Sequence, residues 1–159
     1  MYLKQGFSLI EILVVIVILS ICASFLTIAT GDFGAKRQVI INAEQLNHYI
    51  KLLQQRAILS GDTLGIKFSM EGYTPYILTN NQWHVLSKKG IFHFYAFAKK
   101  TQIYLTRNSL RSPEIIIYNS GDLNEFTIRF GTKNEPHILT LIGQTNGELS
   151  LIQQKDDKK

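Results

Sequence analysis

The sequence predicts an α+β protein: a long N-terminal helix, with a transmembrane half and an amphipathic half, packed on an antiparallel, β-sandwich-like head. Three observations predict this fold class: an apolar N-terminal segment, a stretch of helical periodicity that ends near Ser60, and a series of short β-type runs after Gly61. The 159 residues suffice for one small domain and an anchor. With 45% hydrophobic and 18% charged residues, the composition is that of a folded chain.

The N-terminal segment is the first element. From Ile12 to Gly31 there are 20 residues without a formal charge. A helix of that length, at about 1.5 Å per residue, spans a hydrocarbon core of roughly 30 Å. A cleaved secretory signal would have a shorter apolar region and a small-residue cleavage site, for which "ATGDFGAKRQ" is a poor match. We expect a retained transmembrane helix; a cleaved signal and a buried helix of a soluble protein are the alternatives.

Glu11 puts an ionisable carboxylate at the start of this segment. In one interpretation it is an interfacial group that the positive end of the helix dipole favours. At the centre of a bilayer it would cost about 2.5–3.5 kcal/mol on insertion scales, so a cationic partner would help to retain it. Cutting the chain after Gly6 would create such a cation, the amine of Phe7, one helical turn from Glu11.

The stretch "KQGFSLIEILVVIVIL" resembles the class III signal of type IV prepilins and type II secretion pseudopilins. The match comprises a short basic leader (residues 1–6) that ends in Gly6, then Phe7, then Glu11 five residues beyond the glycine, and an aliphatic helix. The resemblance implies that a prepilin peptidase cuts between Gly6 and Phe7 and N-methylates Phe7. It also implies that Glu11 forms an assembly salt bridge with the Phe7 amine of an adjacent subunit.

A weak point follows in "TGDFGA", where two glycines disfavour a helix. Asp32 could cap a restarted helix, so we expect a joint between a transmembrane and assembly helix over residues 7–31 and an amphipathic helix over residues 32–60. The second helix should end near Ser60-Gly61, where glycine acts as the terminator. Its apolar stripe should pack against the head; the stripe consists of Val39, Ala43, Leu46, Ile50, Leu53 and Ala57.

The β-rich head is expected over residues 61–152, and a loose tail over residues 153–159. The head contains nine runs of β type: "LGIKFS", "YTPYILT", "QWHVLS", "IFHFYAF", "QIYLT", "EIIIY", "FTIRFG", "HILTLIG" and "ELSLIQ". "MEG" and "TNG" between neighbouring runs predict hairpin turns. So many short runs indicate antiparallel sheets, covered by the apolar stripe of the helix.

Chemical sites are sparse in this sequence. Cys22 is the only cysteine, so it cannot form an internal disulfide. "NSGDLNEF" gathers Asp122, Asn124 and Glu125, which could bind calcium, but the EF-hand pattern is missing and we expect a polar turn. We expect no enzymatic activity, no metal site and no cofactor, because no phosphate loop or nucleophile elbow is evident and the histidines show no ligand spacing: His48, His84, His93 and His137.

The middle of the head has a basic bias with interleaved aromatic residues. This combination can bind single-stranded DNA through stacking and phosphate contacts. Aromatic residues in strands more often face the core, while lysines mark solvated ends, so nucleic acid is not the expected partner. The residues concerned are Lys88, Lys89, Lys99, Lys100, Arg107 and Arg111, with Phe92, Phe94, Tyr95, Phe97 and Tyr104.

Two stretches narrow the family. "AEQLNHYIKLLQQRAILSGDTLGIKF" and "IIIYNSGDLNEFTIRFG" resemble the GspH/FimT-like minor pseudopilins. This resemblance implies a minor pseudopilin H near the tip of the periplasmic pseudopilus of a type II secretion system. The chain would be a single-pass protein of a Gram-negative inner membrane, with its head in the periplasm. Its partners would be the major pseudopilin, other minor pseudopilins, the prepilin peptidase and the inner-membrane assembly platform.

Two alternatives remain at this point. One is a FimT-like minor pilin of a type IV pilus, which serves fibre initiation or DNA uptake. DNA-binding members resemble this chain but have an arginine-rich C-terminal motif, whereas this sequence ends in "QQKDDKK". The other is a membrane-anchored periplasmic binding module that is neither processed nor polymerised.

Overall fold

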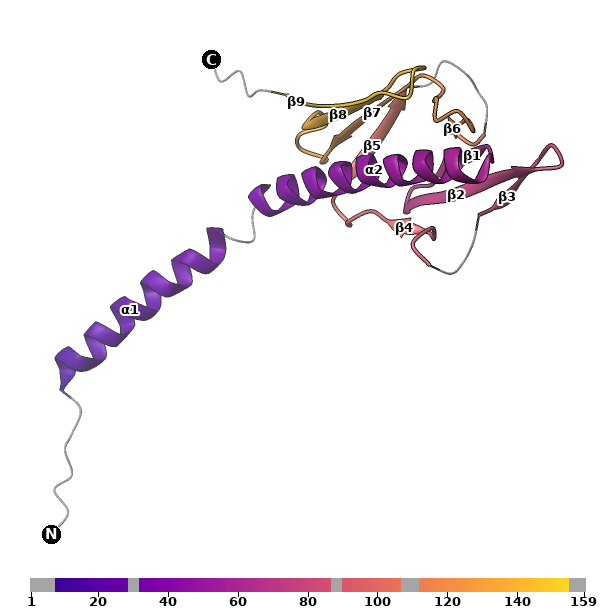
Figure 1. The fold of residues 1–159 in the computed structure, drawn as a ribbon. Coiled ribbons are helices and arrows are strands. Elements are labelled where there is room, and N and C mark those ends of the chain that lie inside the picture. Colours follow the sequence, from indigo (N-terminus) through magenta and orange to yellow (C-terminus); the bar gives the residue numbers. More distant parts are fainter. Residues whose placement is uncertain (1–7, 29–31, 87–89, 107–111, 155–159) are drawn as a thin grey trace, which may run out of the picture. The chain divides into compact units, whose positions relative to one another are not determined.

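The computed structural model describes residues 8–28, 32–86, 90–106 and 112–154. The chain divides into two units, Met1–Gly34 and Ala35–Lys159, and each is described by itself. The first unit contains helix α1 (Leu9–Ile28); helix α2 (Asp32–Ser60) lies almost wholly in the second unit, which also holds both sheets (Figure 1). Some residues to which the sequence analysis gives a role lie outside the described part: Gly6, Phe7, Lys88, Lys89, Arg107, Arg111 and most of the tail.

Helix α2 forms where the apolar stripe predicts it. All six stripe residues, from Val39 to Ala57, are fully buried. The helix stops because Gly61 adopts φ +72°, a left-handed conformation that glycine reaches without a side-chain clash. The Gly61 amide still donates to the Ala57 carbonyl (2.9 Å), and Ser60 Oγ donates to the Arg56 carbonyl (2.8 Å). Both contacts satisfy carbonyl groups of the last turn.

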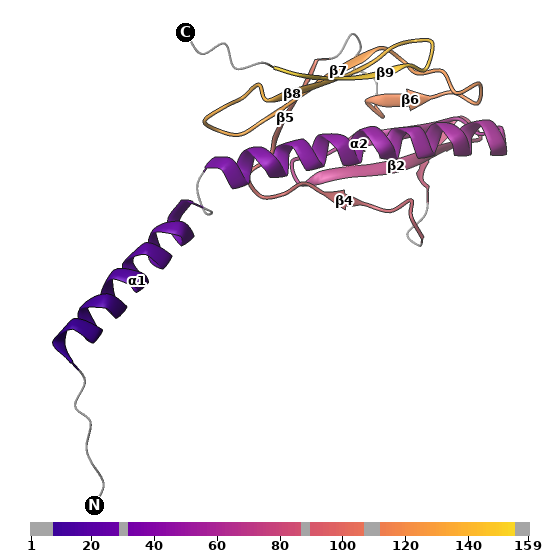
Figure 2. The same ribbon diagram turned by 60° about the vertical axis from the view of Figure 1, so that its left-hand side comes forward.

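Two antiparallel sheets make up the rest of the second unit. The first has the order β3-β2-β1-β6, with β4 paired to β2 as well; the second has the order β5-β7-β8-β9. Figures 1 and 2 show α2 running lengthwise along the head, with the β1–β2 sheet on one side and the β7–β9 sheet on the other. The strands are β1 (Leu64–Phe68), β2 (Gly72–Thr79), β3 (Gln82–Val85), β4 (Tyr95–Ala96), β5 (Gln102–Thr106), β6 (Ile115–Ile117), β7 (Phe126–Gly131), β8 (Leu139–Gly143) and β9 (Leu149–Gln153).

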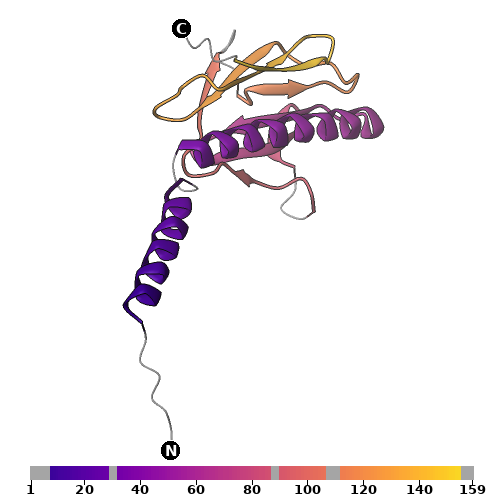
Figure 3. The same cartoon turned by 90° about the vertical axis from the view of Figure 1, so that its left-hand side faces the viewer.

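A single core joins the helix to both sheets. Figure 3 shows α2 running between the two sheets. Leu46 and Ile50 of α2 belong to the same buried cluster as Ile66 of the first sheet and Phe130 of the second. Close-packed aliphatic and aromatic side chains of this kind supply most of the free energy of folding. The observed fold is therefore the α+β class that the sequence predicts, with the helix packed on a two-sheet head.

The two predicted hairpins are present. At the first, the Ser69 amide donates to the Gly72 carbonyl (2.8 Å), which joins β1 to β2. At the second, the Gln144 amide donates to the Glu148 carbonyl (2.9 Å), and Gly147 has φ +82°. Period-2 patterning and turn residues are local signals, which explains why the sequence could indicate both turns.

The run "IFHFYAF" differs from its prediction, because only Tyr95 and Ala96 form a strand. The preceding residues bend instead: His93 Nδ1 donates to the Gly90 carbonyl (2.8 Å), and Tyr95 Oη donates to the Ile91 carbonyl (2.9 Å). The bend lets Phe92 and Tyr95 reach Tyr49 on α2, with ring centroids at 6.1 and 4.9 Å. Aromatic packing against the helix has here replaced ladder pairing along the strand.

Gln54 fixes the helix to two loops of the head. Its Nε2 atom donates to the carbonyls of Gly121 and Gly147, both at 2.8 Å. A Cβ on Gly147 would lie 2.7 Å from the Gly121 carbonyl oxygen and 3.1 Å from Gln54 Nε2, so the close approach requires glycine. One amide group thus ties the β6–β7 loop and the β8–β9 hairpin to the C-terminal half of α2.

Replacing Gln54 with leucine should destabilise the head by about 1–3 kcal/mol, because two partly buried carbonyls lose their donor. Urea denaturation of the full chain in detergent would measure this loss. Gln55→Leu is the matched control, since Gln55 is the next residue and is exposed. Equal midpoints for the two variants would contradict the role given to Gln54.

Candidate functional site

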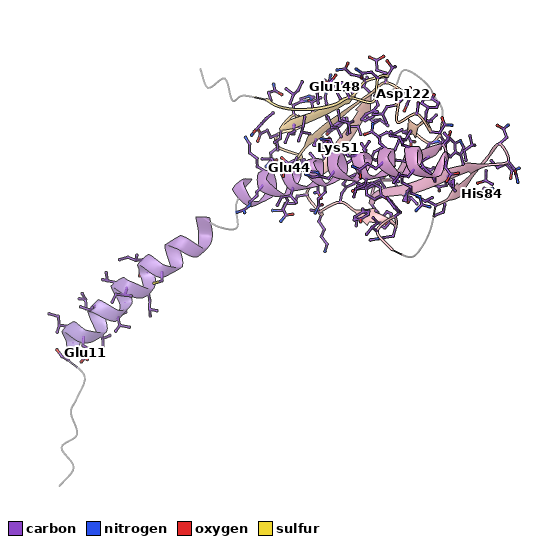
Figure 4. All side chains as sticks on the ribbon, in the orientation of Figure 1. Glu11, Glu44, Lys51, His84, Asp122 and Glu148 are labelled. Carbon is purple, nitrogen blue, oxygen red and sulfur yellow. The ribbon has the colours of Figure 1, made fainter. Side chains whose placement is uncertain are left out.

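Glu11 lies in the first turn of α1, where Figure 4 labels it. The Glu11 amide donates to the Ser8 carbonyl (3.0 Å), and the Ile12 amide contacts the same oxygen (3.3 Å). The Glu11 side chain is exposed. A carboxylate at this position is favoured by the unpaired amides and the positive dipole end of the helix. The predicted partner Phe7 and the predicted cleavage residue Gly6 lie outside the described part, so the salt bridge and the cleavage stay predictions.

The surface of α1 from Leu9 to Cys22 is mainly aliphatic. Between Leu9 and Ile21, the large hydrophobic side chains are between 48% (Val15) and 83% (Leu9) exposed. Glu11 is the one charged residue in the sequence of this helix. An apolar surface that surrounds a helix normally contacts lipid or other helices. Within the residues that the structure describes, no helix is both long and apolar enough to cross a membrane.

Cys22 is a free thiol and is exposed on α1. Its neighbours along the exposed surface are aliphatic, and Ser20 Oγ donates to the Ile16 carbonyl (2.8 Å), as hydroxyl groups within apolar helices commonly do. Glu11 is thus the charged group that the described part of α1 presents, on an otherwise mainly aliphatic surface.

An aromatic cluster lies within the second unit. Tyr49 of α2 meets Tyr73 of β2 and Tyr95 of β4, with centroid distances of 5.3 and 4.9 Å. Burial raises the pKa of the Tyr49 and Tyr73 hydroxyls above the ordinary value; neighbouring tyrosines raise the pKa of both further, while Arg56 lowers that of Tyr49. Arg56 stacks over the Phe92 ring at 4.9 Å. The three tyrosine rings pack between α2 and the first sheet.

The loop with Asp122 and Asn124 is the polar turn that the sequence predicts. Ser120 Oγ donates to Asp122 Oδ2 (2.8 Å), and the Gly121 amide donates to the Tyr118 carbonyl (2.9 Å). Asn124 accepts from the Ile116 amide (2.6 Å) and donates to the Glu114 carbonyl (3.0 Å). Asn124 thereby holds the edge strand β6 in place, a role that was not predicted from the sequence. Across the described ranges, no three His, Cys, Asp or Glu residues gather as a metal site would require.

The aromatic residues of the basic region do not form a stacking platform. Phe92, Tyr95 and Phe97 are half-buried and pack on the core, as the sequence predicts. Phe94 and Tyr104 are exposed, at 44% and 46%. An open cavity of about 370 Å³ adjoins Tyr104; its lining, from Met70, Phe97, Thr101, Gln102 and Ile103, contains no titratable group besides the Tyr104 phenol. Neither feature supplies the charged and nucleophilic groups of an active site.

Known sequences match the N-terminal motif and also most of the length of the chain. Residues 1–27 match the family described as the prokaryotic N-terminal methylation motif. The chain is 24% identical to type II secretion system protein H of Pseudomonas aeruginosa, over 82% of this chain and 84% of that one. It is 18% identical to the protein of the same name from Aeromonas hydrophila, over 98% and 97% of the two chains.

Solved structures share the fold. The minor pseudopilin EpsH from the type II secretion system of Vibrio cholerae superposes with a TM-score of 0.65 and 21% identity, covering 77% of this chain and 99% of that one. The solution structure of GspH from E. coli gives a TM-score of 0.62 and 19% identity, covering 79% and 94%. The α+β fold is thus that of the solved pseudopilins EpsH and GspH.

Proposed function

We propose that this chain, which carries a prokaryotic N-terminal methylation motif on a pseudopilin fold, is a minor pseudopilin of the type II secretion system. The observation that carries the proposal is the presence of both features on one chain. The motif alone occurs on many kinds of fibre subunit, and the fold alone does not require assembly. Their combination, at nearly full length, matches type II secretion system protein H in two organisms.

Processing would create the assembly group. A prepilin peptidase would cut after Gly6 and methylate Phe7, so that a cationic amine lies one turn from Glu11. In a fibre, the Glu11 carboxylate would pair with the Phe7 amine of an adjacent subunit. The exposed position of Glu11 in the first turn of α1 supports this role, because the carboxylate is accessible to a second chain. The assembly of α1 helices would also bury their exposed aliphatic side chains.

Before assembly, the residues 7–31 would lie in the inner membrane, as a single span with the head in the periplasm. The aliphatic surface of α1 supports this placement. Partners in the fibre would be the major pseudopilin and other minor pseudopilins, with the assembly platform in the inner membrane. The chain itself would catalyse no reaction. Its role would be structural, because growth of the pseudopilus would push folded proteins toward the outer membrane.

Deletion of the gene, followed by an assay of secreted enzymes, tests the proposal. We expect folded substrates of the secretion system to accumulate in the periplasm and their extracellular activity to fall to the level of a secretin mutant. Expression of this chain from a plasmid should restore export. Normal secretion, combined with a loss of type IV pili or of DNA uptake, would contradict the proposal and favour a FimT-like minor pilin.

A further inference from the structure

Basic side chains gather at one end of the head, where α2 begins. Lys36 and Arg37 lie in the second turn of α2, and Lys36 Nζ donates to Glu135 Oε1 (3.1 Å) in the β7–β8 loop. Asn42 Nδ2 donates to Thr101 Oγ1 (2.6 Å), directly after Lys99-Lys100. These contacts bring three separate parts of the sequence to the same end of the head.

The pairing of the second sheet confirms this placement. Gln102, the first residue of β5, lies opposite Gly131, the last residue of β7. Lys99 and Lys100 therefore precede one strand, and Lys133 follows its neighbour, at the same edge of the sheet. All three lysines are exposed, as is Arg37. We name this set the basic end: Lys36, Arg37, Lys99, Lys100 and Lys133.

Few carboxylates balance these charges. Among the described residues at the basic end, Glu135 is paired to Lys36, and Glu71 is held near Phe97, whose amide donates to the Glu71 carbonyl (2.8 Å). Glu44 is exposed on the N-terminal half of α2, so this carboxylate lies on the same side. Asp122 and Glu148 (Figure 4) belong to the loops that Gln54 contacts from the C-terminal half of α2. The five cations of the basic end thus outnumber the described carboxylates beside them, which are Glu44, Glu71 and Glu135.

Connectivity decides which end can reach a membrane. Lys36 follows the last residue of α1, Ile28, by eight residues, which extend to about 30 Å at most. If α1 is the anchor, this short connection keeps the basic end within about 30 Å of the point where the anchor leaves the lipid. Charges act over only about 8 Å at physiological ionic strength, so the attraction operates when the basic end touches the headgroups.

We propose that the basic end docks on anionic phospholipid headgroups and orients the head of the unassembled subunit at the membrane surface. This inference rests on the membrane anchor of the proposed function. Lysine and arginine near an anionic surface each add to the attraction, and several together form a polybasic contact. Docking would hold the head of each membrane-resident subunit in one orientation, with the β8–β9 turn away from the lipid. Removal from the membrane into a fibre would break this contact.

The test uses the full chain in vesicles, with Cys22→Ala and a single fluorophore at Gln102→Cys or at Thr145→Cys, which lies in the opposite β8–β9 turn. Energy transfer to headgroup-labelled lipid reports the distance to the surface. With phosphatidylglycerol in the vesicles, transfer from position 102 should exceed that in phosphatidylcholine alone, and added NaCl should abolish the difference. Position 145 should show little dependence on lipid or salt.

Lys99→Glu/Lys100→Glu should lower the docked population by about tenfold or more. The matched pair of single variants is Lys100→Glu and Lys51→Glu, because Lys51→Glu changes net charge equally at an exposed position of α2 away from the basic end and should dock normally. Equal transfer from position 102 in the two lipids, or full docking of the Lys99/Lys100 variant, would overturn the inference while leaving the pseudopilin assignment intact. A chain that fails to float with vesicles would overturn the anchor and the docking together.

Discussion

Glu11→Leu is expected to leave the protein folded and membrane-associated while its incorporation into the pseudopilus falls by about two orders of magnitude. In lipid, the leucine removes the cost of a carboxylate at the edge of the apolar segment, a cost that would reach about 2.5–3.5 kcal/mol at the bilayer centre. In the fibre, it removes the partner of the Phe7 amine. Both changes favour the membrane-resident subunit over the assembled one, so the two effects add. Crosslinking to the major pseudopilin and the activity of exported enzymes would measure the loss.

Glu11→Gln separates charge from shape in this experiment. This substitution keeps the size of the side chain and removes its charge. If the ion pair drives incorporation into the fibre, the glutamine variant should be incorporated as poorly as the leucine variant. The control is Glu44→Gln, which removes a carboxylate from an exposed position on α2, in the second unit. Normal secretion by both Glu11 variants would rule out the pairing role, and α1 would then assemble through aliphatic packing alone.

Gly6→Ala should block removal of the leader and reduce secretion to the level of a deletion strain. The added methyl group changes the residue after which we propose that the leader is cut, and an uncut chain has no amine on Phe7 for Glu11 to bind. The intact mass of the protein extracted from membranes gives the answer directly. We expect a precursor with all six leader residues and no N-methyl group on Phe7.

Gly34→Ala is the matched control for the Gly6 variant. Gly34 is exposed in α2, where alanine is favoured over glycine by about 1 kcal/mol, so this variant should be cut and methylated normally. A mature-sized, methylated product from the Gly6→Ala chain would show that the peptidase does not require this glycine. It would also remove the main reason to place the cut between Gly6 and Phe7.

The buried stripe of α2 shows how far local pattern reaches. Helical spacing identified all six stripe residues from Val39 to Ala57, and each is fully buried. Gly61 marked the end of the helix because its left-handed conformation is a property of a single residue. The alternating runs of the head were identified on the same basis, and so was the turn at Gly147. Such features depend on residues close in sequence, so they can be predicted before the fold is known.

The run from Ile91 to Phe97 marks where local pattern fails. Its composition favours a strand, yet most of it bends so that Phe92 and Tyr95 pack on Tyr49, more than forty residues away in sequence. The strand propensity of a segment depends on its own residues, so it does not predict a contact with a residue on another element, such as Tyr49 on α2. The same holds for Gln54, whose hydrogen bonds depend on where two distant loops come to rest.

The sequence by itself determined the N-terminal motif, with Glu11 in the first turn of an aliphatic helix, as well as the helical stripe and the strands. Each of these is encoded by spacing along the chain. Only the tertiary structure decided that Gln54 holds two loops, that three tyrosines share one cluster, and that Lys36, Lys99 and Lys133 lie at one end of the head. The physical reason is that contacts between residues far apart in sequence form only when the sheets pack on α2. The periodicity of the sequence reports local structure and does not predict such contacts.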